Sequence, residues 1–260
     1  MKSRVAFITA NFVARESGWA MTDWGHGDRA TTEAFRPVET YRERFGALCG
    51  DVAALGFGAI DIWGAHLGPD WATDDHVDAA REALAEHDLI VTSYQVYAPA
   101  QHLERACAIA AALGSTSLSG FAPLEDERLP GLLERHGLLF GLENHPEPTP
   151  RAILEKVRDV PHVGVCVDTG WFGTQGYDPA RAIEELGDRV LHVHLKDVLH
   201  AGEPHETCRW GEGVVDVEAC VRVLQRIGYT GAIAVEHEPA TFDPSEEIAW
   251  MRARLEEWLA

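Results

Sequence analysis

Leu138-Leu139-Phe140-Gly141-Leu142-Glu143 is a short apolar run that ends on a carboxylate. Short apolar runs with polar boundaries are typical of buried parallel strands. Three other runs end in the same way: 163–167 before Asp168, 190–193 before His194, and 232–235 before Glu236. A polar residue at the same place in four strands predicts that the carboxyl ends of these strands share one site.

The rest of the chain repeats the same unit, a strand followed by an amphipathic helix. Predicted strands begin near Val5, Ala59, Leu89, Ser115, Leu138, Val163, Val190 and Ala232. Predicted helices cover 39–55, 73–87, 100–113, 149–158, 178–186, 216–227 and 245–259, with a weaker one at 123–136. Strand–helix units repeated through 260 residues predict a single-domain (β/α)₈ TIM barrel over residues 1–260.

A doubly wound sheet is the competing architecture, but it would place a glycine-rich loop after its first strand. Here residues 11–15 contain no glycine. Gly56, Gly114 and Gly228 follow apolar helix ends as left-handed caps, and Pro150 and Pro179 suit first helical turns. Long loops are expected at about 11–38 and 197–215, on the face where barrel active sites lie.

The net charge of −20 repels a phosphate backbone, so nucleic acid is not expected as a partner. No run approaches the roughly 18 apolar residues that span a bilayer. The short apolar part of the N-terminus reads as a strand and not as a signal peptide. Five cysteines without a Cys-x-x-Cys pair indicate neither disulfides nor a thiolate zinc site. A reduced, cytoplasmic location is therefore expected.

Glu143, Asp168, His194 and Glu236 form the ligand set of a hard or borderline divalent cation. Each alone also fits a structural role, as a helix cap, a turn, a buried imidazole or a solvated charge. Together, at the strand ends of a barrel, they predict one metal ion: Mn²⁺ first, with Mg²⁺ or Co²⁺ as alternatives. The metal would polarise a carbonyl while Glu143 and Glu236, from non-adjacent strands, remove and return a proton.

Six stretches carry a resemblance to a known family: Ala-Ile-Asp-Ile-Trp-Gly-Ala-His (59–66), Gly-Leu-Glu-Asn-His (141–145), Val-Asp-Thr-Gly (167–170), His-Val-His-Leu-Lys-Asp (192–197), Gly-Glu-Gly-Val-Val-Asp (211–216) and Val-Glu-His-Glu (235–238). In this order the chain resembles the xylose isomerase-like barrels, also called the sugar phosphate isomerase/epimerase superfamily. The resemblance implies that Glu143, Asp168, His194 and Glu236 bind the metal and that the two glutamates act as acid and base. It also implies that His194 and not His192 is the imidazole ligand. His192 lies deeper, and we interpret it as a core residue or as a support for the ligands.

The superfamily includes metal-dependent abasic-site endonucleases, which this sequence does not match. Those enzymes have a histidine three residues after the aspartate of the sixth strand, where this chain has Trp171. Their Asp-x-His pair before the Gly-x-Gly turn is replaced by His205-Glu206-Thr207. A three-metal cluster and a role in DNA repair are therefore not expected.

Further substrate contacts are expected at or near the strand ends and in the long loops. His66 and His145 could donate to substrate hydroxyls or support the metal ligands. Lys196 could neutralise an enolate oxygen or pair with Asp197. Arg209 could clamp a hydroxyl or carboxylate, or remain a solvated loop residue. Cys208 lacks an evident base, which argues against nucleophilic catalysis.

Tryptophan is frequent near the expected site, at positions 19, 24, 63, 71, 171 and 210. Aromatic faces stack on the C–H-rich faces of sugar and cyclitol rings, although they also pack loops onto barrel rims. This interpretation makes Trp171 a substrate-binding residue. No anion cradle or paired-arginine clamp is evident, which argues against a phosphorylated substrate.

These observations predict a divalent-metal-dependent sugar or cyclitol isomerase/epimerase that works through an enediolate. The alternative is a metal-dependent lyase on a keto-sugar, similar to inosose dehydratases or the catalytic subunits of C-glycoside deglycosidases. A non-catalytic polyol-binding barrel is a third hypothesis, which the intact ligand set disfavours. The expected partner is a small sugar or polyol. A homo-oligomer, or a second subunit in the lyase case, stays open.

Overall fold

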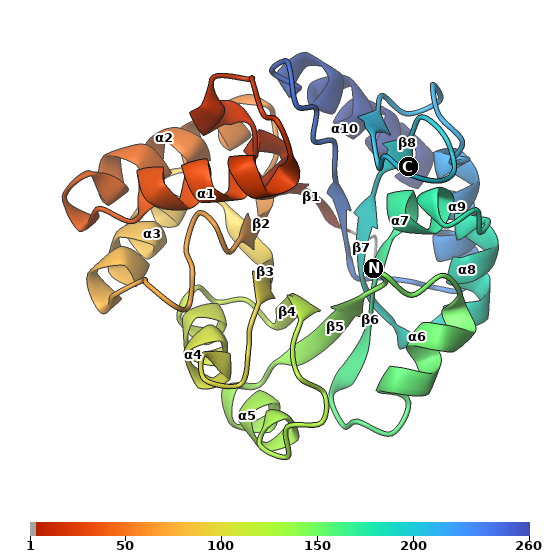
Figure 1. Cartoon of the computed structure of the whole chain (residues 1–260), viewed down its shortest axis with the longest axis horizontal. Coiled ribbons are helices and arrows are strands. Elements are labelled where there is room, and N and C mark those ends of the chain that lie inside the picture. The colour runs from red at the N-terminus through yellow and green to blue at the C-terminus, as the bar shows by residue number, and fades with distance from the viewer. Residues whose placement is uncertain (1–3) are drawn as a thin grey trace.

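The computed structural model describes residues 4–260. Parallel strands close into a barrel in the order β1-β10-β7-β6-β5-β4-β3-β2, so that β1 pairs with β10. The predicted (β/α)₈ barrel is confirmed, and helices surround the ring of strands (Figure 1). The barrel strands are β1 (Arg4–Ile8), β2 (Ala59–Trp63), β3 (Ile90–Tyr97), β4 (Ser117–Phe121), β5 (Leu139–Glu143), β6 (Val163–Asp168), β7 (Val190–Leu195) and β10 (Ala232–Val235).

The predicted helices lie outside the barrel as expected. They are α2 (Val38–Ala54), α3 (Asp74–Glu86), α4 (Leu103–Ala112), α5 (Leu129–His136), α6 (Pro150–Val157), α8 (Pro179–Leu186), α9 (Val217–Arg226) and α10 (Ser245–Leu259). The weak helix α5 begins six residues later than predicted. Gly56, Gly114 and Gly228 have φ angles of +87°, +76° and +74°, which confirms the left-handed ends after α2, α4 and α9.

The segment after β1 differs from the prediction of a long loop. It contains two short 3₁₀ turns, Thr9–Phe12 and Arg15–Ser17, and the helix α1 (Trp24–Phe35). Asp23 caps α1 by accepting a hydrogen bond from the backbone N–H of His26 at 2.9 Å. Gly27 lies so close to Val13 that a Cβ would come within 2.7 Å of it. Glycine lowers helix propensity, and here it conceals a helix that tertiary packing stabilises.

The second long loop, after β7, is organised by the buried carboxylate of Asp197. It accepts hydrogen bonds from four backbone N–H groups, those of Val198, Gly211, Gly213 and Val215, at 2.8–3.1 Å. The short strands β8 (Asp197–Val198) and β9 (Thr207–Cys208) pair antiparallel inside this loop, and the short helix α7 (Thr169–Thr174) packs against it. Because these four N–H groups lack partners in a regular sheet within residues 4–260, the Asp197 carboxylate takes their hydrogen bonds and gives the loop a defined shape.

The main core lies between the strands and the helices. It includes fully buried aromatic side chains such as Phe7, Tyr41, Phe45 and Phe140. Burial of such side chains contributes roughly 1.5–3 kcal/mol each relative to exposure. This core stiffens the strands and therefore fixes where their carboxyl ends place polar side chains.

None of the helices described over residues 4–260 has the length and apolar content needed to cross a membrane.

Candidate active site

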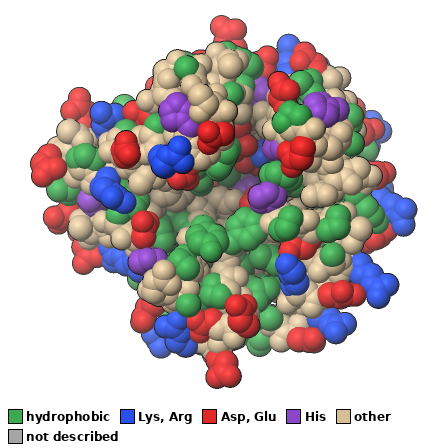
Figure 2. Space-filling model, viewed as in Figure 1, with side chains coloured by type: hydrophobic (Ala, Val, Ile, Leu, Met, Phe, Trp, Pro, Cys, Tyr) green, Lys and Arg blue, Asp and Glu red, His purple; other side chains and the backbone are tan. Residues whose placement is uncertain are grey.

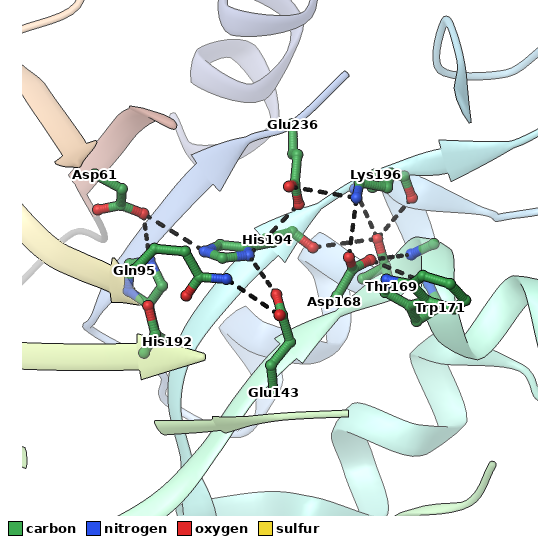
Figure 3. A network of polar contacts seen from close by, with 12 residues as sticks. Asp61, Gln95, Glu143, Asp168, Thr169, Trp171, His192, His194, Lys196 and Glu236 are labelled. Carbon is green, nitrogen blue, oxygen red and sulfur yellow. Dashed lines mark hydrogen bonds and ion pairs between the residues drawn. The ribbon is translucent and has the colours of Figure 1, made fainter. Parts of the chain in front are cut away.

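His194 lies at the centre of a buried polar cluster inside the barrel (Figure 3). Its Nδ1 atom is 3.0 Å from Oε1 of Glu143 and 3.5 Å from Oε2 of Glu236. Glu143 ends β5 and Glu236 follows β10, and the two side chains approach the imidazole from different sides (Figure 3). Asp168 ends β6 and is the register partner of His194. The four residues expected to bind a metal thus come from four strand ends around one space.

Lys196 lies beside this cluster and is almost completely buried. Its Nζ atom is 3.1 Å from Oδ2 of Asp168, 3.3 Å from Oε1 of Glu236 and 3.0 Å from Oε2 of Glu238. Burial by itself would lower the pKa of Lys196, but the three carboxylates outweigh it and hold that pKa well above its usual value. Lys196 is therefore a fixed positive charge at neutral pH, and its partners are these carboxylates.

Glu238, on the far side of Lys196, was not among the expected site residues. Burial raises its pKa well above the usual value; Glu236 adds to this effect, while Lys196 opposes it. Glu238 is thus a carboxyl group near the pocket that retains a proton more readily than an ordinary glutamate. Its position two residues after Glu236 in Val-Glu-His-Glu was the available sequence signal.

Two asparagines fix the strand ends that carry the acidic residues. Asn11 donates from Nδ2 to the carbonyl oxygen of Val235 at 3.0 Å and accepts from the backbone N–H of His237 at 2.7 Å. Asn144 does the same for Asp168: it donates to its carbonyl oxygen at 3.0 Å and accepts from its N–H at 2.7 Å. Both amides are fully buried. These paired bonds leave Glu236 and Asp168 little freedom to shift along their strands.

Beneath His194 lies a second polar layer, in which His192 takes the deeper position expected of it and Asp61 was not foreseen. Asp61, in the middle of β2, accepts one hydrogen bond from the Thr92 hydroxyl through Oδ1 and pairs through Oδ2 with Nε2 of His192. Nε2 of His194 is 3.8 Å from the same Asp61 oxygen and has no hydrogen-bond partner within residues 4–260. Asp61 therefore faces the ring nitrogen of His194 that points away from Glu143 and Glu236 (Figure 3). A charged residue inside an apolar strand was the signal.

The residues around His194 fit a divalent cation on the side that faces Glu143 and Glu236. Among residues 4–260, sets of three ligand atoms within 4.8 Å are Asp61–His192–His194 and Glu143–Cys166–His194. Each set contains an internal hydrogen bond, between Asp61 and His192 in the first and between Glu143 and His194 in the second. Asp168 and Glu236 belong to neither set. Glu143 and Glu236 offer carboxylate oxygens, and Oε2 of Glu236 is buried with no hydrogen-bond partner in the described part of the chain. Carboxylates with one imidazole are donors that suit Mn²⁺, Mg²⁺ or Co²⁺.

A pocket of about 1280 Å³ opens above this cluster. Glu143, Asp168 and Glu236 reach its wall, as do the expected substrate contacts His145, Lys196 and Trp171. Four of the six noted tryptophans also line it: Trp24, Trp63, Trp71 and Trp171. The other two pack elsewhere, Trp19 against Phe12 and Trp210 against Trp258.

Trp171 is held between two imidazoles. Its ring centroid is 3.7 Å from that of His145 and 3.9 Å from that of His205. Both faces of the indole are therefore in contact with protein, and its edge is the part that remains for a ligand. Burial lowers the pKa of His205 to about 3, so this imidazole is uncharged at neutral pH.

The structure places two other expected substrate contacts away from the pocket wall. His66 is buried, with its ring against Phe35 and Trp63, and burial lowers its pKa to about 3. Arg209 lies with its guanidinium 4.1 Å from the ring centre of Trp250. Neither residue is among those that line the pocket. The pocket geometry therefore does not support the prediction that His66 and Arg209 contact a substrate directly.

The cysteines near the site are not poised to act as nucleophiles. Burial raises the pKa of Cys166 and of Cys208 to about 12, so both are thiols at neutral pH. A thiolate is the reactive form of cysteine. The chemistry of this pocket is therefore carboxylate, imidazole and ammonium chemistry.

Fold and site together define a (β/α)₈ barrel with a carboxylate–histidine cluster at its strand ends. The sequence profile described as xylose isomerase-like TIM barrel matches residues 49–254. The chain belongs to this family, as the resemblance of its motifs predicted.

Individual relatives are distant and differ in their named reactions. A Streptomyces coelicolor protein named only provisionally as a hydroxypyruvate isomerase is 22% identical over 251 residues, covering 77% of this chain and 88% of its own. An inosose dehydratase of Lacticaseibacillus casei is 31% identical over 110 residues, which cover 36% of this chain and 37% of that enzyme. The solved structure of an L-ribulose 3-epimerase superposes with a TM-score of 0.68 at 17% identity, covering 99% and 94% of the two chains. That structural likeness concerns the fold alone.

Proposed function

We propose that this protein is a divalent-metal-dependent isomerase or epimerase of a sugar or cyclitol, with Glu143 and Glu236 as the proton-transfer pair. The observation that supports this most is the placement of these two carboxylates. Both are more than 90% buried, both reach the pocket wall, and they approach His194 from different strands. Two carboxylates on different sides of one space suit the removal of a proton from a carbon and its return.

Glu143, Asp168, His194 and Glu236 would hold the metal. When bound there, a divalent cation supplies Lewis acidity that polarises a substrate carbonyl and its neighbouring hydroxyl oxygen. The preferred ion in this proposal is Mn²⁺, with Mg²⁺ or Co²⁺ as alternatives. Gln95 would orient Glu143, because its Nε2 atom donates to Oε2 of that carboxylate at 3.1 Å.

In the proposed reaction one glutamate takes the proton from the carbon beside the carbonyl, and the electron pair of that C–H bond forms the enediolate. The other glutamate returns a proton, either to the opposite face of the same carbon or to the neighbouring carbon. The first outcome is epimerisation and the second is isomerisation. The ammonium of Lys196 would stabilise negative charge that develops on a substrate oxygen nearby.

A lyase is the second candidate, and the 31% identity to an inosose dehydratase over 110 residues favours keeping it. The same enediolate could expel a substituent from the next carbon in place of accepting a proton. Proton removal by a glutamate is common to both candidates. They differ in whether the carbon skeleton retains all its oxygen and carbon substituents.

Proton NMR in D₂O tests the proposal and separates the two candidates. Protein supplied with Mg²⁺ is incubated with ketoses, keto-glycosides and inososes, and the experiment is repeated with Mn²⁺ and Co²⁺ followed by metal removal. Deuterium beside the carbonyl with the skeleton intact supports the isomerase or epimerase. An enone or a released aglycone supports the lyase. A panel without exchange or elimination under all three metals would refute both, provided that metal binding is verified in the same samples.

A small sugar or polyol is the proposed partner, and the acidic pocket gives a nucleic-acid phosphate no favourable position. Location in the cytoplasm and assembly with a second copy or another subunit remain predictions from the sequence.

A further inference from the structure

Three aromatic side chains are exposed at the mouth of the pocket. Trp24 is 44% exposed, Tyr97 74% and Phe242 44%, and all three belong to the pocket lining. Within residues 4–260, the other large hydrophobic residues exposed to this degree are aliphatic and lie outside the pocket lining. Figure 2 shows hydrophobic side chains gathered around a hollow on the face in view. Exposed rings that collect at one pocket indicate a surface that a ligand covers.

These rings come from separate parts of the chain. Trp24 begins α1, Tyr97 ends β3, and Phe242 lies between β10 and α10. Trp24 is held in place by Trp63, with ring centroids 5.5 Å apart. Their presence in the lining of one pocket is therefore a product of the fold and not of one apolar stretch. We call this set, Trp24, Tyr97 and Phe242, the mouth rings.

The charges of the pocket oppose an anionic ligand. Lys196 is the one lysine or arginine that lines it among residues 4–260, and three carboxylates already surround its ammonium. Glu143, Asp168, Glu236 and Glu238, all ionised, would together with Lys196 and a divalent ion carry a net charge of −1. The acidic lining residues are Asp23, Asp28, Asp70, Glu143, Asp168, Glu203, Glu206, Glu236 and Glu238. A phosphate or carboxylate placed away from Lys196 would face these acidic residues, and the lining described within residues 4–260 offers no second lysine or arginine to offset them.

The pocket is also larger than a single sugar ring requires. Its 1280 Å³ exceeds the roughly 300–1,000 Å³ of pockets that enclose a drug-sized ligand. We propose that the substrate is an uncharged keto-glycoside, whose apolar, aromatic aglycone lies on the mouth rings while its sugar ring presents the ketone and the neighbouring C–H to Glu143 and Glu236. This inference rests on the proposed function for the sugar end and on the mouth rings for the other end.

Isothermal titration of the Mn²⁺-supplied protein tests the aglycone site without requiring turnover. The probes are matched phenyl and methyl β-D-glycosides of glucose, galactose and xylose, with glucose 6-phosphate as the anionic probe. For at least one sugar the phenyl glycoside should bind about tenfold more tightly than its methyl partner. Equal or weaker binding of all phenyl glycosides, no binding included, overturns the inference. So does tighter binding of glucose 6-phosphate than of the methyl glucoside.

Tyr97→Ser and Phe242→Ser should remove the phenyl advantage and leave methyl glycoside affinity unchanged. Ile90→Ser is the matched control, because Ile90 is 49% exposed at the opposite end of the same strand as Tyr97. A phenyl advantage that survives both ring variants, or that Ile90→Ser also removes, refutes the assignment. Light scattering of the same variants decides the competing occupant: if both ring variants convert a dimer into monomers, a second copy covers the rings and the inference is wrong.

The two proposals fail separately. If phenyl glycosides bind more tightly but no deuterium exchange occurs, the aglycone site is supported and the isomerase proposal is refuted. If exchange occurs but phenyl and methyl glycosides bind equally, the isomerase proposal is supported and the aglycone site is refuted.

Discussion

Glu143, Asp168 and Glu236 are 7%, 1% and 4% exposed around His194, whereas Trp24, Tyr97 and Phe242 at the mouth of the same pocket are 44–74% exposed. The inner groups are carboxylates at the ends of barrel strands. Asn11 and Asn144 fix the backbone of two of these strand ends, and Lys196 contacts Asp168 and Glu236. The mouth rings are apolar and sit on a helix start, a strand end and a loop. Rigid, buried charges suit a reaction that needs fixed geometry, whereas exposed rings suit recognition of an apolar group. The contrast in burial therefore assigns the reaction to the inner carboxylates and the selection of the substrate to the mouth rings.

Glu236→Ala should give the largest effect, because it removes both a proposed metal ligand and half of the proton-transfer pair. Turnover should fall by at least about 10²–10⁴-fold. Steady-state rates measure the loss, and circular dichroism with thermal melting verifies that the barrel persists. Glu212→Ala, in the loop after β9 and outside the pocket lining, is the matched control. If the folded Glu236→Ala enzyme kept normal turnover, the proposed role of Glu236 in metal binding and proton transfer would be wrong.

His194→Ala should release the metal, because this ring is the one imidazole of the proposed set. Affinity for Mn²⁺ should fall by more than about 100-fold, beyond the loss typical of an outer partner. Calorimetric titration with Mn²⁺ and elemental analysis of the purified protein both report it. Unchanged occupancy would mean that the wrong histidine was chosen and would point to His192.

Asp61→Asn should weaken the metal site more moderately. Asp61 faces Nε2 of His194 at 3.8 Å and would orient that ring as a buried acceptor. Loss of such an outer partner typically costs about 10–100-fold in metal affinity. The same titration measures it, and Asp51→Asn on α2, far from His194 in the fold and paired with Arg15, serves as the control. If Asp61→Asn abolished binding as completely as His194→Ala, Asp61 would be a ligand itself.

The prediction for His66 concerns the stability of the fold and not turnover or metal binding. Its pKa is about 3 in the folded protein against a usual value near 6.5, so the unfolded chain takes up a proton that the folded protein refuses. This part of the stability is complete above about pH 6.5 and is lost as the pH falls toward 3. The slope reaches up to ~1.4 kcal/mol per pH unit. His66→Gln should flatten the pH dependence of urea unfolding between pH 7 and 5, whereas His200→Gln, at an exposed position, should not. Equal slopes for all three proteins would contradict the buried, neutral state of His66.

The strand ends were predictable because a buried strand appears in the sequence as a short apolar run with a polar residue after it. The apolar runs before Glu143, Asp168, His194 and Glu236 locate β5, β6, β7 and β10 to within a residue or two. Polar residues that follow such runs must lie at the carboxyl face of a parallel barrel. The helix α1 was missed because glycines at positions 25 and 27 obscure its propensity, and its packing against Val13 is not a local property.

The sequence by itself indicated the barrel and the four residues proposed as metal ligands, since periodicity and strand-end position are local and repeat along the chain. The family followed from the resemblance of its motifs. Only the tertiary structure decided the partners of Lys196, the placement of Asp61 beneath His194, and the position of Arg209 on Trp250. It alone brought Trp24, Tyr97 and Phe242 to one mouth. Contacts between side chains more than 25 residues apart depend on how strands and loops are arranged around the barrel, and no local pattern in the sequence encodes that arrangement.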